Sequence, residues 1–110
     1  MEAVNKFPFP YKVFSKEEIL AFAANAIADK QIIGWFQGSS EFGPRALGNR
    51  SIFANPTCPS TKYLLDHLMK CRDRYRPYAP VVLEDRASRF FDIDSSSPVM
   101  MRNVKVLDKR

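Results

Sequence analysis

A run of glycine and arginine between two apolar stretches is the part of this sequence that most directly suggests chemistry. Residues 34–52 read GWFQGSSEFGPRALGNRSI. Glycine lets backbone amides approach a ligand, and arginine offers a planar fork that matches a carboxylate or a phosphate. The run therefore predicts a pocket for an oxyanion. Its candidate residues are Arg45, and more weakly Gly43, Gly48, Asn49 and Arg50. The alternative is a structural turn in which Glu41 and Arg45 form a surface ion pair of little energetic value.

A second basic segment follows, in which four cations stand on alternate positions. They are Lys70, Arg72, Arg74 and Arg76. Like charges this close repel one another unless an anion or a carboxylate lies among them, and Asp73 alone cannot neutralise four. The segment is therefore a second candidate for anion binding. A solvated helix end, where cations also suit the helix dipole, remains the alternative.

Charge and composition restrict the class of partner. The net charge of +5, from 17 Lys and Arg against 12 Asp and Glu, favours an anion. Tyr75 and Tyr78 could stack on bases, but no nucleic-acid reader motif is present, so we expect a small anionic ligand and not nucleic acid. Cys58, Cys71 and His67 lack the spacing of a metal site, so we expect no metal ligands and reduced cysteines.

Periodicity and turn residues predict an α/β (α+β) domain of 110 residues. Residues 1–14 are expected to form an extended arm, and a capping box at Ser15 and Glu18 opens the first helix. The expected helices are 16–29, 60–71 and 85–91, and the expected strands are 31–37, 51–54, 79–84 and 99–107. Such a sheet would have an open edge, which could pair with a second copy or another domain.

Nothing in the sequence predicts membrane insertion or export. No apolar run approaches the roughly 20 residues that cross a bilayer. The N-terminus MEAVNKFPFPYKVF lacks the pattern of a signal peptide, so we expect a cytoplasmic protein.

Three motifs in order resemble one family. They are GWFQG followed by EFGPRALGNRSI, then K.R..YRP.AP.VLE, then SPVM. Together they resemble the C-terminal domain of the NodU/CmcH-type O-carbamoyltransferases, from about Ser15 to Met101. The resemblance implies a YrdC-like fold, a mixed open sheet with flanking helices, of which residues 15–110 would form an incomplete half-domain. It covers neither the transferase domain nor the second half of the C-terminal domain. Ser39-Ser40 stands where the family usually has Arg-Met.

The resemblance also implies a function. In that family the domain binds carbamoyl phosphate and ATP, with magnesium, and forms carbamoyladenylate for transfer to a hydroxyl. Its basic pocket residues correspond to Arg45, Lys70 and Arg76. We assign no catalytic residue and expect the chain not to be active alone. The alternative is a non-catalytic binding or oligomerisation module derived from the same domain.

Overall fold

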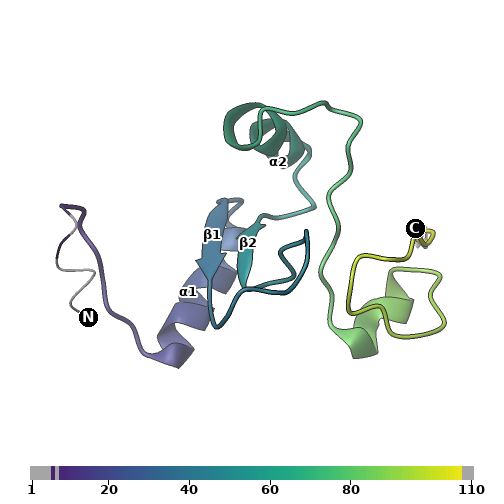
Figure 1. Cartoon of the computed structure of the whole chain (residues 1–110), viewed down its shortest axis with the longest axis horizontal. Helices are drawn as coiled ribbons and strands as arrows, with labels where there is room; N and C mark the ends of the chain where they lie inside the picture. Colours follow the sequence, from purple (N-terminus) through teal and green to yellow (C-terminus); the bar gives the residue numbers. More distant parts are fainter. Residues whose placement is uncertain (1–5, 7, 108–110) are drawn as a thin grey trace.

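The computed structural model describes residues 6 and 8–107 and consists of short elements joined by long connections (Figure 1). In chain order they are α1 (Lys16–Ala28), β1 (Ile33–Phe36), β2 (Arg50–Phe53), α2 (Pro59–Leu64), the π-helical turn η2 (Leu65–Met69) and the 3-10 helix η3 (Glu84–Arg89). Residues 10–15 lead into α1 without helix or strand, and residues 1–5 and 7 of the expected arm lie outside the described residues. The chain is a small mixed α/β fragment, as its sequence predicts.

The first helix begins where its capping box predicts. The Ser15 amide donates to Glu18 Oε2 at 2.7 Å, and the Glu18 amide donates to Ser15 Oγ at 3.2 Å. These bonds satisfy amides that the first turn of a helix leaves without partners. Ala23 and Ala26 are the buried residues of α1, which contacts β1 and supports the sheet from one side.

The sheet has two antiparallel strands. Ile33 pairs with Phe53, and Phe36 pairs with Arg50. The loop from 38 to 49 joins them, so the glycine-arginine run is a hairpin connection held at both ends by paired backbone. The strands expected at 31–37 and 51–54 are confirmed in shorter form.

Two expected strands are wrong. Residues 79–83 have no regular structure, and 99–107 contribute only a single bridge between Val106 and Phe91. A strand needs a neighbour to which its backbone can bond, and Pro80 lacks one of the required donors. Alternating apolar residues alone could not supply that neighbour.

The two later helices form with different hydrogen bonding from an ordinary α-helix. The helix expected at 60–71 is α-helical only to Leu64 and continues as η2, where the Lys70 amide donates to the Leu65 carbonyl at 2.9 Å. The short helix expected at 85–91 is the 3-10 helix η3.

Little of the apolar surface is buried. Among the described residues, Ala23, Ala26 and Leu65 are the buried hydrophobic side chains, while Phe36 is 76% exposed. The radius of gyration is 16.2 Å, compared with about 13 Å for a compact domain of this length. No helix within the described residues has the length and apolar character needed to cross a membrane.

Candidate functional site in two basic segments

The loop from 38 to 49 is closed by a carboxylate of its own. Glu41 Oε1 accepts the amide of Leu47 at 2.7 Å and the amide of Asn49 at 2.8 Å. Between them, the amide of Gly48 donates to Ser51 Oγ at 3.0 Å. The Asn49 amide, followed by other backbone amides, holds the pKa of Glu41 below its ordinary value. These three amides already have acceptors, so they offer a ligand no unpaired donor.

Arg50 is part of the same framework. Its Nη1 donates to the carbonyls of Gln37 at 2.6 Å and Asn49 at 2.8 Å, and its Nη2 donates to that of Gly38 at 3.0 Å. The guanidinium lies 3.4 Å from the centre of the Phe36 ring. Its planar fork therefore ties the two ends of the loop together.

The remaining candidates of the 34–52 run divide into residues that shape the loop and one exposed arginine. The Asn49 side chain donates to the Ser39 carbonyl at 2.7 Å, which also stabilises the loop. Gly43 and Gly48 have φ angles of +136° and +119°, which residues other than glycine rarely adopt. Arg45 follows Gly43 in the exposed part of the loop, and its side chain makes no recorded hydrogen bond or ion pair with any described residue. The Glu41–Arg45 ion pair is not formed.

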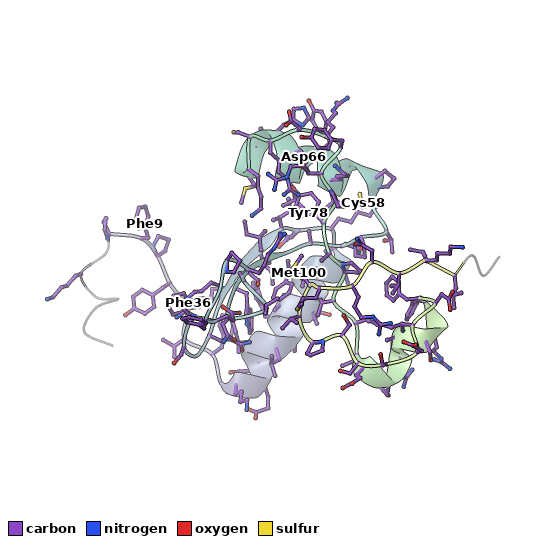
Figure 2. The ribbon with its side chains drawn as sticks, turned by 45° about the vertical axis from the view of Figure 1, so that its right-hand side comes forward. Phe9, Phe36, Cys58, Asp66, Tyr78 and Met100 are labelled. Carbon is purple, nitrogen blue, oxygen red and sulfur yellow. The ribbon has the colours of Figure 1, made fainter. Side chains whose placement is uncertain are left out.

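The second basic segment is organised around Asp66, which is 1% exposed. Its Oδ2 accepts Lys62 Nζ at 2.6 Å, and its Oδ1 accepts the Tyr78 hydroxyl at 2.8 Å and Arg72 Nε at 3.3 Å. Figure 2 shows Tyr78 beneath the helical segment that carries Asp66. The hydrogen bond from Lys62, with those from Tyr78 and Arg72, lowers the pKa of Asp66 to about 2 against the opposing effect of desolvation.

The backbone turns sharply to make this arrangement possible. Cys71 has a φ of 46°, in the left-handed region, and the next amide, that of Arg72, donates to the Asp66 carbonyl at 3.0 Å. The Arg72 guanidinium then lies 4.0 Å from the centre of the Tyr78 ring. Desolvation, followed by the bond to Asp66, raises the pKa of Tyr78.

The four alternating cations consequently have different surroundings. Arg72 is bound to Asp66, and Arg74 lies over the Tyr63 ring with its guanidinium 5.4 Å from the ring centre. The side chains of Lys70 and Arg76 are exposed and have no recorded partner within residues 6 and 8–107. Of the four cations, Asp66 therefore pairs with Arg72, and Asp73 forms no recorded ion pair with a described residue.

Sequence reasoning missed Asp66 and Lys62. Their i, i+4 spacing in the second helix was a usable signal, because such residues lie on one helix face and can form an ion pair. The burial of Asp66 and its bond to Tyr78 depend on the turn at Cys71, which no local pattern predicts.

The two basic segments are not bonded to each other. No recorded hydrogen bond, ion pair or ring contact between described residues joins the 38–49 loop to the 70–78 segment. An open, mainly apolar hollow of about 470 Å³ between α1 and β1 is lined by Ile19, Leu20, Trp35 and Phe36 and contains none of the candidate cations. The described residues include no group of three or more His, Cys, Asp or Glu placed to hold a metal.

Comparison with known proteins identifies the family of this chain. Residues 24–110 match the family described as carbamoyltransferase C-terminus. The chain is 50% identical over 80 residues to nodulation protein NolNO of Sinorhizobium fredii, an alignment covering 73% of this chain and 12% of the relative. It is 49% identical over 77 residues to nodulation protein NolO of Bradyrhizobium diazoefficiens, covering 70% of this chain and 14% of the relative. Nodulation protein U of the same organism is 42% identical over 80 residues, covering 71% and 14%. The chain thus spans less than a sixth of the length of these relatives, and it belongs to the carbamoyltransferase C-terminus family.

Proposed function

We propose that this chain binds carbamoyl phosphate and the phosphates of ATP and, within a full-length enzyme, contributes to forming carbamoyladenylate for transfer to a hydroxyl. One observation carries the proposal. In each basic segment some arginines are bound internally, as Arg50 and Arg72 are, while Arg45, Lys70 and Arg76 have no recorded partner among the described residues. These three are the residues that the family resemblance assigns to the ligand.

The chemistry of the three cations suits a phosphorylated ligand. Arg45 and Arg76 can each present two parallel N–H donors to phosphate oxygens, and Lys70 can supply a point charge. Cations held there would also offset the charge that develops on the phosphate as it leaves the carbamoyl group. Because Glu41 and Ser51 occupy the loop amides, side chains would make the contacts. The proposal requires each segment to reach a phosphate of the ligands, not to touch the other segment.

The implied cofactors fit this surface to different degrees. The unpartnered cations suit the phosphates of ATP, whereas magnesium binds carboxylates together with substrate phosphates. The described residues supply no cluster of potential metal ligands, so we assign no residue to magnesium. The proposal places the protein in the cytoplasm, where ATP is available.

The test compares the three proposed ligand residues with a matched cation elsewhere. Arg45→Ala, Lys70→Ala and Arg76→Ala should each weaken carbamoyl-phosphate binding by about tenfold or more, the loss expected for a charge-assisted hydrogen bond. The thermal midpoint should change little, because these side chains are exposed and make no recorded hydrogen bond or ion pair with a described residue. Calorimetric titration measures the affinity.

Arg89→Ala is the control, since Arg89 is exposed on η3 and its loss removes the same charge outside both segments. It should leave the affinity nearly unchanged. Equal losses in all four variants would mean that the net charge attracts the anion and that no defined site exists.

A second candidate function is a non-catalytic module that binds a second copy or another domain. The exposed apolar side chains support it, including Phe36 on β1, where the two-stranded sheet has open edges. Light scattering should then show association as concentration rises. A monomer throughout the accessible concentration range would count against this alternative.

A further inference from the structure

Asp66 joins α2 to the second basic segment. Lys62 lies one helical turn before it, Arg72 lies beyond the turn at Cys71, and Tyr78 lies at the end of the segment. All three side chains donate to its two carboxylate oxygens at 2.6–3.3 Å. No buried side-chain polar atom of the described residues lacks a hydrogen-bond partner, so both oxygens of the buried Asp66 carboxylate are satisfied.

The network also fixes the backbone between these points. The Arg72 amide donates to the Asp66 carbonyl at 3.0 Å, and Arg72 Nη2 donates to the Pro77 carbonyl at 3.3 Å. Lys62 Nζ, besides binding Asp66, donates to the Arg74 carbonyl at 2.6 Å. Residues 72–78 are therefore held against α2 and η2 at several points (Figure 2).

Arg76 lies within residues 72–78 and Lys70 lies just before them, but neither side chain bonds to Asp66, Lys62, Arg72 or Tyr78. Lys70 immediately precedes the left-handed Cys71, and Arg76 lies between Arg74 and Pro77, whose carbonyls the network binds. The carbonyls on either side of Arg76 are thus held by Lys62 and Arg72, the two cations that bind the Asp66 carboxylate, and Lys70 lies next to the turn that leads to Arg72. The side chains of Lys70 and Arg76 are exposed.

We propose that Asp66 is a positioning residue for anion binding: it binds Lys62 and Arg72 and so holds Lys70 and Arg76 where they can contact a phosphorylated ligand. This inference rests on the proposed function. It assigns to a buried acid a role in binding an anion, which simple charge arithmetic would not suggest.

The direction in which Asp66→Asn changes the affinity for an anion distinguishes a positioning role from a simple effect of charge. Removing a carboxylate from a basic region strengthens anion binding if long-range attraction alone operates. Removing it weakens binding if the carboxylate holds the ligand residues in place. Asp66→Asn is close in size to the native side chain and keeps one acceptor oxygen, so it tests this difference with little change in volume.

The experiment titrates the full 110-residue chain with carbamoyl phosphate and, separately, with inorganic phosphate. Asp66→Asn should weaken binding of both by about tenfold, roughly the loss of one ligand contact. Asp73→Asn is the matched control, because Asp73 lies in the same segment, is exposed, and loses the same charge. It should leave the affinity unchanged or increase it.

Two further variants address loss of folding and a merely structural role. Tyr78→Phe removes one hydrogen bond to Asp66 but keeps the carboxylate charged, so it should weaken binding by about threefold while circular dichroism stays native. Lys70→Ala should cost much less affinity in the Asp66→Asn background than in the unchanged chain, because Lys70 is no longer held in place.

The possible outcomes are distinct. If the unchanged chain binds, but Asp66→Asn and Tyr78→Phe both bind as tightly or more tightly, the positioning role is overturned and the proposed function stands. If the two Asn variants lose affinity equally, the effect does not come from the Asp66 network, and the inference again fails. No binding by the unchanged chain would overturn the proposed function together with this inference.

Discussion

At the scale of single residues, the neighbours of an arginine decide what its charge can do. Arg45 and Arg50 stand five positions apart in one motif, yet Arg50 binds three carbonyls and Arg45 binds no described residue. The sequence correctly predicts a glycine-shaped turn with cations, because glycine conformation is a local property. It does not distinguish a ligand-binding arginine from a structural one, since that depends on which carbonyls the folded loop brings together.

This difference predicts that Arg50 contributes to stability. Arg50→Ala should lower the free energy of unfolding by roughly 2 kcal/mol, because it removes several charge-assisted hydrogen bonds and a cation–π contact. Arg50→Lys keeps the charge but not the fork and should lose about half as much. Urea denaturation followed by circular dichroism measures both. A stability unchanged in Arg50→Ala would show that these contacts do not hold the loop.

Asp66 predicts a dependence of stability on acid. Its folded-state pKa of about 2 is below the ordinary value of 3.8, so the ionised carboxylate stabilises the fold above about pH 4. This contribution is lost as pH falls from about 4 to about 2. Asp66→Asn should therefore be less stable at neutral pH and lose less stability over that interval. Thermal melts at a series of pH values test this, and parallel curves for the two proteins would contradict it.

At the scale of elements, short sequence patterns correctly predict the helix and the hairpin, which form through hydrogen bonds between residues near one another in the chain. The capping box gives the start of α1, and the strands on either side of the glycine-arginine run pair as a hairpin. The strands expected at 79–84 and 99–107 fail for the opposite reason. Their apolar residues fit a strand, but a strand exists only through bonds to a partner, which is a property of the whole fold.

The capping box supplies a prediction at this scale. Ser15→Ala removes the acceptor of the Glu18 amide and should lower the free energy of unfolding by about 1 kcal/mol. The loss of helical signal should begin at lower urea concentration. Ser40→Ala, in the exposed part of the loop, is the control and should have almost no effect. Equal behaviour of the two variants would mean that the cap does not stabilise α1.

At the scale of the whole molecule, the fold is open. Asp66 is fully buried, whereas many large apolar side chains are exposed, and the radius of gyration of 16.2 Å exceeds that of a compact domain. Composition gives no warning of this, because 45% hydrophobic residues is an ordinary value. Whether such residues are buried depends on long-range packing. The absence of a bond between the two basic segments has the same origin, since motif order shows membership of the family but not which parts of the chain bond to one another.

A calorimetric titration of the unchanged chain with carbamoyl phosphate, with and without ATP and magnesium, tests the proposed function most directly, with inorganic phosphate for comparison. We expect saturable binding of carbamoyl phosphate at a defined stoichiometry, weakened when Arg45, Lys70 or Arg76 is replaced. Absence of saturable heat at millimolar carbamoyl phosphate would contradict the proposed function, and would show that these three cations do not form a binding site in this chain.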